Sequence, residues 1–507
     1  MESSKNDKNW SRKAGWEALA ATTLLTAFFC FWRLGADTIL GFDEGRHAVN
    51  ALEMYRNKDW IISTYNGEID YFNLKPPLSM YMIMCGYALF GMNTFGIRVG
   101  SAFCYLLTAL ISAGYVAQKK SCWAASFTML LFGSSKLLLF CSMARKGDAN
   151  SFFNFCVTLS LILLLVLCDR KQKDAAKRET LLCIGMGLGC AAAFLSKSFH
   201  AAVPVLVILI LFLRMGRKKI HPAEWMTFLA SAAVPVLLWA VLRYQRDGLT
   251  FFHGMLFEDV VHRTQEKIAG TEGSLLYYFI QLFKENTSLI VLFLLGIYGA
   301  LCIYHGASIK EGKALLRPDR LTLVLWILIP CVIYAVPTTK LITYSYPSYI
   351  ALYICGGLLL PDLLKQTESG LGKVMVCLFV CFTVILSGIN LKDCVYQISR
   401  EQRDSLEELF QEHEDLFTGT GNIYTNHWNE YQGDVWYQDE LLAVELYTPL
   451  HAKDGGIQSY LDDRGESYLI LNYIWTEPDE RIFDKGEGGE TIYRDEYFRV
   501  IKKEKQH

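Results

Sequence analysis

The sequence predicts an α-helical polytopic membrane protein that ends in a small soluble α/β domain. Three observations support this fold class. Of the 507 residues, 52% are hydrophobic and 13% are aromatic, and the mean hydropathy of +0.22 is too high for an ordinary soluble protein. Apolar runs of about the length that a bilayer requires recur along most of the chain. Beyond Leu391 the composition becomes polar and rich in acidic residues.

Eleven apolar runs approach the roughly twenty residues that cross a hydrocarbon core. The first follows a polar, basic N-terminus and precedes no convincing small-residue cleavage site, so we expect an uncleaved signal anchor. The two runs between 180 and 214 are short, and we expect them to pack within the helix bundle. The runs lie at 15–34, 96–117, 122–143, 149–168, 180–196, 200–214, 224–243, 285–304, 319–337, 341–361 and 373–391.

A further apolar run, at 78–91, is ambiguous because it is short, follows Pro76-Pro77 and ends at Gly91. We interpret it as an interfacial helix, because counting it as a span would turn the basic segment 170–178 outward, against the positive-inside rule. The N-terminus is then cytoplasmic and the C-terminal domain extracytoplasmic, in a multi-pass plasma-membrane protein. The loops expected on the cytoplasmic side are Lys119-Lys120, Asp169–Arg178, Arg214–Lys219 and Lys310–Arg320.

The predicted division into a membrane domain, 1–392, and a soluble domain, 393–507, follows the change in composition. In the soluble part, 398–414 has helical spacing, and strands are expected at 422–426, 467–472 and 496–503. The Trp, Tyr and Asp residues there would suit sugar binding, but they equally suit a small domain resting on the bundle, which we favour. The net charge of −2 indicates no nucleic-acid partner.

The outer loop 35–95 carries the most suggestive chemistry. It holds the adjacent Asp43 and Glu44, then Arg46 and His47, and later the Lys75-Pro76-Pro77 corner. Carboxylates and a lysine held beside a bilayer are the groups needed to handle a lipid-borne phosphate leaving group. The alternative is that Asp43 only caps a helix and Lys75 extends to the lipid headgroups. The other segments expected on the outer face are Ala144–Asp148, the Lys197 turn, 244–284 and 338–340.

Together these motifs resemble the C-type (GT-C) glycosyltransferases that use lipid phosphosugars, especially the protein O-mannosyltransferases and the bacterial lipid A aminoarabinose transferases. The resemblance covers about residues 15–350 and is loose beyond. It implies the GT-C fold and a sugar transfer from a polyprenyl-phosphate donor to a hydroxyl acceptor on a protein, lipid or glycan, with no required cofactor. The motifs are Phe42-Asp43-Glu44, Arg46, Glu53-Met54, Asp59-Trp60, Asn66-Gly67, Lys75-Pro76-Pro77-Leu78, Leu89-Phe90-Gly91 and Arg98-Val99-Gly100-Ser101.

The resemblance also implies roles for single residues. Asp43 matches the family's essential acid, the expected general base, and Asp148 matches a second outer-face acid, so that the expected catalytic set is Asp43, Glu44 and Asp148. Two departures from the family pattern are Lys197-Ser198, where the family has Lys-Gly, and Lys340-Leu341-Ile342, where it has Lys-Arg-Pro. The expected contacts to the donor phosphate are Lys75, Arg263, Lys340 and Tyr344, with support from Arg46, His47 and Lys197.

Elementary chemistry agrees with these roles and leaves alternatives open. A single base predicts direct displacement with inversion at the anomeric carbon. Lys340 and Tyr344 are four residues apart, so on a helix they would face the same way. Asp148 begins a span and could be its N-cap, and a divalent metal on the acidic residues remains an alternative. A transporter or flippase of lipid-linked sugars is the other class. The sequence shows no paired inverted repeats, and its charges gather at one face.

Overall fold

The computed structural model describes residues 2–169, 176–216, 220–257, 273–304, 317–429, 433–473 and 488–505. The chain divides into two compact units. The first comprises Met1–Leu34, Leu74–Cys85 and Arg98–Arg400, and the second comprises Gly35–Asn73, Gly86–Ile97 and Glu401–His507. The first unit is helical, whereas the second combines most of the outer loop with the C-terminal sheet. The division expected at residue 392 stays a prediction.

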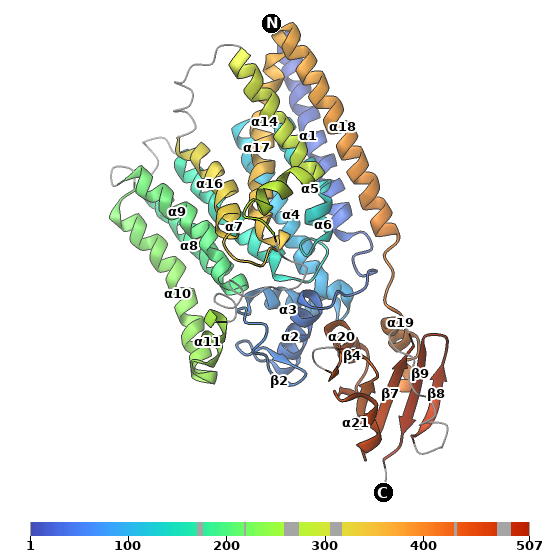
Figure 1. Ribbon diagram of the computed structural model, residues 1–507. Coiled ribbons are helices and arrows are strands. Elements are labelled where there is room, and N and C mark those ends of the chain that lie inside the picture. The colour runs from blue at the N-terminus through green and yellow to red at the C-terminus, as the bar shows by residue number, and fades with distance from the viewer. Residues whose placement is uncertain are drawn as a thin grey trace. The chain divides into compact units, whose positions relative to one another are not determined.

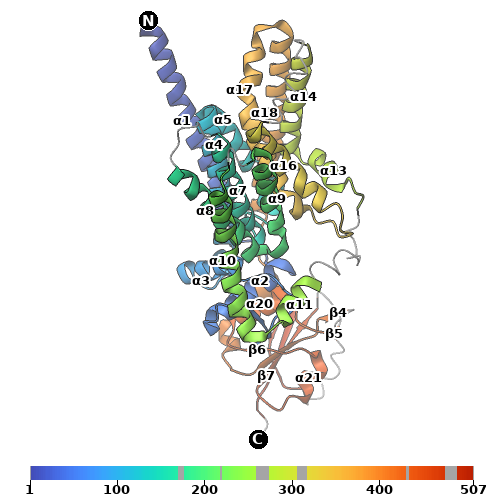
Figure 2. The ribbon, with the colours of Figure 1, turned by 90° about the vertical axis from the view of Figure 1, so that its left-hand side faces the viewer.

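The first unit is a bundle of long helices. Helix α8 packs against both α7 and α10, and α1 packs against α5. Figure 1 shows α8 and α10 (green) side by side, and Figure 2 shows α14, α17 and α18 running together. The helices are α1 (Glu2–Phe31), α3 (Leu78–Phe90), α4 (Thr94–Lys119), α5 (Cys122–Gly133), α6 (Lys136–Phe140), α7 (Ala149–Cys168), α8 (Ala176–Lys197), α9 (Ala202–Met215), α10 (Pro222–Asp247), α11 (Thr250–Leu256), α13 (Tyr277–Lys284), α14 (Asn286–Tyr304), α16 (Pro318–Ile333), α17 (Tyr346–Leu364) and α18 (Gly370–Ser399), where α3 and α4 also extend into the second unit.

Within the described ranges, eight helices are long and apolar enough to cross a membrane, so the protein is a multi-pass helical membrane protein. Every one of the eleven predicted runs coincides largely with helix. The runs 180–196 and 200–214 join through the 3-10 turn η1 (Ser198–Ala201) into one apolar stretch, Lys177–Met215. Helices α5 and α16, of 12 and 16 residues, are shorter than a full span.

The prediction of one continuous helix over 122–143 is wrong. Helix α5 ends at Gly133, and the Ser135 hydroxyl then caps α6 by accepting a hydrogen bond from the Leu138 N–H at 3.3 Å. This break makes Lys136 the first residue of α6, with its ammonium 3.5 Å from the Asp393 carboxylate. The helix break therefore explains how a lysine is accommodated inside an apolar run.

Ion pairs and hydrogen bonds show which helix ends lie together at each end of the bundle. Lys119 pairs with Asp169 at 2.5 Å, and Lys120 pairs with Asp362 at 2.7 Å, so the ends of α4, α7 and α17 lie together. At the opposite end of α4, the Arg98 guanidinium donates to the Leu34 carbonyl at 3.4 Å. Because the chain leaves α1 and begins α4 at the same end, the 13-residue α3 makes no net crossing, which confirms that 78–91 is not a span.

In the second unit, the described residues include a mixed sheet of five strands. The C-terminal strands predicted at 422–426, 467–472 and 496–503 are confirmed as β3, β7 and β9. The helix predicted at 398–414 is wrong as one helix, because α18 ends at Ser399 and a new helix starts after the N-cap Asp404. The sheet order is β6 (His451–Ala452), β3 (Asn422–Thr425), β7 (Ser467–Asn472), β9 (Phe498–Lys503) and β8 (Glu490–Arg494), with β3 parallel to β6 and β7, and β9 antiparallel to β7 and β8.

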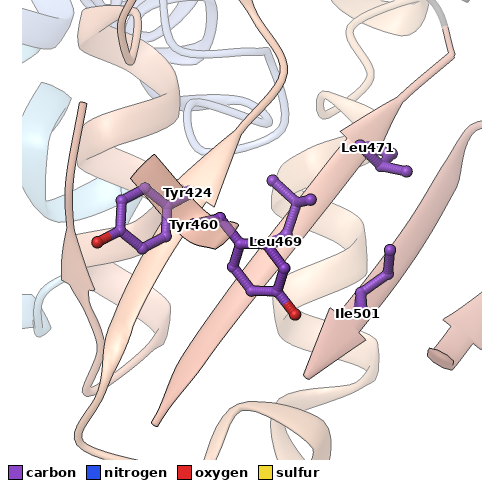
Figure 3. Close-up of a cluster of buried hydrophobic side chains, with 5 residues drawn as sticks. All are labelled: Tyr424, Tyr460, Leu469, Leu471 and Ile501. Carbon is purple, nitrogen blue, oxygen red and sulfur yellow. The ribbon is translucent and has the colours of Figure 1, made fainter. Parts of the chain in front are cut away.

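Smaller elements complete the second unit, and one buried cluster holds its sheet together. Figure 3 shows that cluster, formed by Tyr424, Tyr460, Leu469, Leu471 and Ile501 from β3, α21, β7 and β9. Fully burying one such apolar side chain contributes roughly 1.5–3 kcal/mol. The remaining elements are α2 (Asp43–Asn57), β1 (Thr64–Tyr65), β2 (Glu68–Ile69), α19 (Ser405–Glu412), β4 (Trp428–Asn429), β5 (Gly433–Asp434), α20 (Gln438–Tyr447) and α21 (Gly456–Asp462).

The orientation of the chain in the membrane can be tested with two introduced cysteines. We expect Glu496→Cys, at the exposed turn between β8 and β9, to react in intact cells with a membrane-impermeant maleimide. Lys365→Cys, at the end of α17 that carries the Lys120–Asp362 pair, should not react. The Lys365 side chain is 75% exposed, so its protection would report the membrane and not burial within the protein.

Two controls complete the labelling experiment. Permeabilised cells should label both positions, and the wild type gives the background from native cysteines. Labelling of the Lys365 position in intact cells would overturn the orientation.

Candidate functional site

The start of α2 presents Asp43 on a constrained turn. Phe42 occupies the N-cap position with φ 62° and ψ −110°, so Asp43 is the first helical residue and not the cap that the alternative required. Asp43 is exposed, and the helix N-terminus favours its ionised form. Glu44 is buried, and its carboxylate accepts the Leu40 N–H at 2.9 Å. The structure thus gives Glu44 the task of closing the turn that carries Asp43.

Arg46 is part of a clamp that fixes the outer loop. Its guanidinium donates two hydrogen bonds to Asp70, at 3.0 and 2.8 Å, and lies over the rings of Tyr65 and Phe72 at 4.1 and 4.3 Å. Burial opposes ionisation of Asp70, but the hydrogen bonds and charge of Arg46 outweigh it and hold the pKa of Asp70 below its usual range. Arg46 therefore holds the outer loop through a partner that the sequence did not identify, and its support of the phosphate contacts stays a prediction.

His47 lies inside a buried amide network. The Asn73 side-chain amide donates to Asn50 Oδ1 at 2.8 Å and lies 3.2 Å from His47 Nδ1. Asn50 in turn donates to Asp70 at 2.9 Å. His47 thus holds the loop together. The residues that we missed are Asn50, Asp70 and Asn73. They carried one weak signal, because Asp70 and Asn73 lie shortly before the Lys75 corner.

In the first unit, Asp148 and Lys197 are linked through one amide side chain. Asp148 caps α7 by accepting the Ala149 N–H at 2.5 Å, so the N-cap alternative is confirmed. Its second carboxylate oxygen accepts a hydrogen bond from the Asn150 amide, whose oxygen accepts one from the Lys197 ammonium. Asp148, Asn150 and Lys197 are all buried. Capping therefore uses one carboxylate oxygen, and the other connects Asp148 to a buried cation.

Aromatic rings surround the Lys197 ammonium. It lies 5.5 Å from the Tyr344 ring centre and 6.0 Å from that of Phe153, within the range of cation–π attraction. The Tyr344 ring contacts the rings of His200 and Tyr334 at 4.9 and 4.8 Å. The structure thus brings together three predicted residues, Asp148, Lys197 and Tyr344. Sequence reasoning missed His200 and Tyr334, because η1 and the residue that follows α16 meet here only through packing.

The Lys75 corner is anchored on both sides. On one side Leu74 is buried against Trp239 and Phe251 of α10 and α11. On the other, the Ser79 hydroxyl donates to the Ser196 carbonyl at 3.3 Å, one residue before Lys197. Lys75 itself is half-buried. These contacts place the Lys75 corner at the same end of the first unit as the Lys197 turn.

The expectation that Lys340 and Tyr344 share a helix face is wrong. The 3-10 turn η4 covers only Ile342–Ser345, so Lys340 precedes it. The Lys340 ammonium donates to backbone carbonyls at the end of α16, those of Tyr334 at 3.4 Å, Ala335 at 2.7 Å and Pro337. Its contact with a phosphate stays a prediction. Arg263 lies outside the described residues.

Other features of the first unit do not contribute to this cluster. A cavity of about 1260 Å³ lies among α1, α4 and α5, lined mainly by apolar side chains with Arg12 among them, and it contains none of the predicted site residues. Among the described residues, no group of three or more His, Cys, Asp or Glu side chains is placed to hold a metal ion.

Comparison with known proteins finds similarity to glycosyltransferases that use lipid-linked sugars. The family model described as dolichyl-phosphate-mannose-protein mannosyltransferase matches residues 74–239. An undecaprenyl phosphate-alpha-4-amino-4-deoxy-L-arabinose arabinosyl transferase of Yersinia enterocolitica is 25% identical over 351 residues, which are 68% of this chain and 60% of that relative. A protein of the same name from Shewanella sediminis is 27% identical over 354 residues, with the same shares. The chain thus spans 60% of the length of these relatives.

Solved structures show the same fold. ArnT from Cupriavidus metallidurans, bound to undecaprenyl phosphate, superposes with a TM-score of 0.66 at 16% identity, covering 96% of this chain and 98% of that one. The archaeal oligosaccharyltransferase AglB from Archaeoglobus fulgidus gives a TM-score of 0.54 at 11% identity, covering 92% and 70%. The likeness to ArnT extends over nearly the whole of both chains, including the C-terminal region.

Replacing Ser198 by glycine should stabilise the protein. Ser198 follows Lys197 with φ 52°, in the left-handed region that glycine adopts without strain, and the Ser198 hydroxyl is buried without a hydrogen-bond partner among the described residues. We expect Ser198→Gly to gain about 1 kcal/mol, measured as a higher unfolding temperature in detergent. Ser196→Gly, the same change inside α8, should lower it. A lower unfolding temperature for Ser198→Gly would contradict this account.

Glu445 should make stability fall as pH rises. Burial, and then the hydrogen-bonded Glu53 beside it, raise the pKa of Glu445 well above its usual range. The folded state therefore keeps a proton that the unfolded chain loses near pH 4.3, so this group lowers stability above that pH, by at most about 1.4 kcal/mol per pH unit. Glu445→Gln removes the titration, and its unfolding temperature should increasingly exceed that of the wild type between pH 5 and 8. The exposed Glu490→Gln should follow the wild type, and parallel profiles for Glu445→Gln would refute the shift.

Proposed function

We propose that the chain is a C-type glycosyltransferase related to the mannosyl and aminoarabinose transferases, and that it transfers a sugar from a polyprenyl-phosphate donor to a hydroxyl-bearing acceptor on the extracytoplasmic side. The observation that carries this proposal is the cluster in the first unit, where Lys197 and Tyr344 lie together with Asp148. The Lys75 corner is anchored beside the same turn. Cations and hydroxyl groups at one end of a membrane bundle suit a lipid-linked phosphate.

The donor class follows from the relatives and from the chemistry of the cluster. Relatives are named for a sugar carried on undecaprenyl phosphate, and a solved neighbour binds undecaprenyl phosphate. When the bond between the anomeric carbon and the phosphate breaks, negative charge grows on the leaving oxygen. Lys75 and Lys197 offer ammonium groups that stabilise such charge in a partly desolvated site. We assign the same task to Arg263, whose planar fork can bind two phosphate oxygens.

We assign proton abstraction to Asp43. Its carboxylate is exposed at the first residue of α2, and the helix N-terminus favours the ionised form that a base requires. In the proposed step, Asp43 takes the proton of the acceptor hydroxyl, whose oxygen forms a bond to the anomeric carbon. The bond to phosphate breaks on the opposite face, and the polyprenyl phosphate leaves with the electron pair. One displacement inverts the anomeric configuration.

The roles of the other candidates follow from their contacts. Asp148 holds Lys197 through Asn150, so it orients a phosphate-binding cation and does not act as a second base. Glu44 and Arg46 hold the turn and the loop around Asp43. The acceptor is a protein, lipid or glycan with a free hydroxyl. We also propose that the N-terminus is cytoplasmic. With that orientation, the clustered cations face the extracytoplasmic side, where the donor would be used.

The test of this function is turnover by the purified protein. We expect the wild type in detergent to release polyprenyl phosphate from polyprenyl-phosphate sugars when a hydroxyl acceptor is present. Asp43→Asn keeps the shape of the side chain and removes its basicity, so turnover should fall by roughly a hundredfold or more. Donor binding should stay near the wild-type level, because the phosphate contacts are unchanged.

A matched variant and a transport assay make the outcome decisive. Asp37→Asn, a half-buried aspartate six residues earlier in the same loop, should retain wild-type turnover. Detergent removes any membrane gradient, so a transporter would show no chemistry there. If the purified protein released no polyprenyl phosphate with any donor, while vesicles moved lipid-linked sugar, the transferase proposal would fail. Wild-type turnover in Asp43→Asn would remove Asp43 from its role.

A further inference from the structure

We propose that Gln438, in the C-terminal part of the chain, is a positioning residue for Asp43. The inference rests on the proposed function, in which Asp43 is the base. Gln438 is the first residue of α20, and its side-chain oxygen accepts a hydrogen bond from the Phe42 N–H at 3.2 Å. Phe42 directly precedes Asp43 and has a positive φ of 62°. Gln438 thus holds the peptide group between Gly41 and Phe42, at the start of the turn that carries Asp43.

The backbone of α2 approaches α20 too closely for this contact to be incidental. A Cβ added to Gly45 would lie 3.0 Å from the Asp439 nitrogen and 3.0 Å from the Gln438 carbonyl carbon. A Cβ added to Gly41 would lie 3.0 Å from an Asp439 carboxylate oxygen. A Cβ at either glycine would be closer than ordinary van der Waals contact, so its neighbours in α20 would have to move by a few tenths of an ångström. The segment around the Phe42–Asp43 turn therefore contacts the start of α20 at Gly41, Phe42 and Gly45.

The start of α20 is itself held rigidly. The Tyr437 N–H donates to the Glu440 carboxylate at 3.1 Å, and the other oxygen of Glu440 lies 3.0 Å from His427 Nδ1. The His427 ring stacks on the Tyr437 ring with centres 4.0 Å apart. Gln438 thus follows a residue that is fixed by both its backbone and its side chain. A rigid support is what a positioning residue needs.

A second contact keeps the two helices in register. At the far end of α2, the Arg56 guanidinium donates to the Glu445 carbonyl at 2.6 Å. Gly45, near the start of α2, lies beside Gln438 at the start of α20, and Arg56, near the end of α2, contacts Glu445 near the end of α20. The two helices therefore run parallel. Their N-termini therefore lie together, and a rotation of α20 would be transmitted to the turn before Asp43.

This arrangement explains how a strained turn persists beside an exposed carboxylate. A non-glycine residue at positive φ is unfavourable, and without a partner for its N–H the Phe42 turn would relax. Relaxation would leave Asp43 chemically intact but misdirected. Misplacing a reacting group by about 1 Å costs up to a hundredfold in rate. Loss of the Gln438 oxygen should therefore lower kcat and leave the KM for donor unchanged.

The experiment compares Gln438→Leu, which keeps the size of the side chain but removes its acceptor, with Gln438→Glu, which keeps an acceptor oxygen. We expect Gln438→Leu to lower kcat by tenfold or more, with the donor KM within twofold of the wild type. Gln438→Glu should recover most of the loss. Gln458→Leu, the same change on the exposed face of α21, should behave as the wild type. A wild-type kcat in Gln438→Leu, or equal losses in both Gln438 variants, would overturn the proposal.

Hydrogen exchange separates this inference from the proposed function. In the purified full-length protein, peptides that contain the Phe42 amide should exchange faster in Gln438→Leu than in the wild type or in Gln438→Glu. Gly45→Ala should have the same effect, because its Cβ would push the two backbones apart. Suppose that the wild type is inactive, and that the Phe42 amide loses protection from exchange only in Gln438→Leu and Gly45→Ala. The proposed function would then be refuted, whereas the positioning contact would be supported. If the Phe42 amide exchanged at the wild-type rate in Gln438→Leu, the positioning contact would be refuted, whether or not the protein turned over substrate.

Discussion

The buried ion pair between Arg46 and Asp70 is the interaction on which the outer loop depends. Asp70 takes two hydrogen bonds from Arg46 and one from Asn50, and its position fixes the residues up to Asn73. Removing one partner of a buried pair leaves an uncompensated charge and costs roughly 3–5 kcal/mol. That is a large share of the stability of an ordinary domain. Arrangements of the loop that separate Asp70 from Arg46 are therefore disfavoured, because they would leave the Asp70 carboxylate buried without its cation.

The same requirement, that a buried charge must have partners, accounts for the contacts of several cations in the first unit. The Arg145 guanidinium donates to carbonyls at the end of α1, including those of Phe29 and Trp32 at 2.9 Å each. The Lys340 ammonium likewise donates to the end of α16. Both satisfy helix C-termini, where backbone carbonyls otherwise lack partners. The contacts of the Lys197 ammonium include a side-chain amide and two aromatic rings. In the proposed function these side chains rearrange around the donor phosphate.

Hydropathy and period were enough to predict most of the fold. The apolar runs became helices, and the segment 467–472 became the fully buried strand β7, because burial of apolar surface dominates both choices. The helix break at Ser134–Ser135 was missed because two serines cost little in a hydropathy average, although their hydroxyls can cap a new helix. The break makes Lys136 the first residue of α6, beside Asp393.

The candidate site was less predictable than the fold, for a physical reason. The family resemblance predicted Asp43, Asp148, Lys75 and Tyr344 as site residues, because a motif ties residue types to particular places in the chain. Their partners are set by packing between distant segments, as in the pairing of Asn150 with Lys197. The spacing argument for Lys340 and Tyr344 failed because it assumed a helix where the chain makes a short 3-10 turn. Spacing indicates contact only within a known element.

Backbone strain connects these observations. Among the described residues, Phe42 directly precedes Asp43 and Ser198 directly follows Lys197, and both adopt positive φ without being glycine. Such residues persist where the surrounding structure over-determines the backbone. Around Phe42 that surrounding structure is the start of α20, from the C-terminal part of the chain. The second unit thus joins, in one compact body, the loop that bears the proposed base and the helix that holds its turn. In the positioning proposal, the C-terminal part of the chain thus has a structural role, the restraint of one strained peptide, which requires no sugar binding.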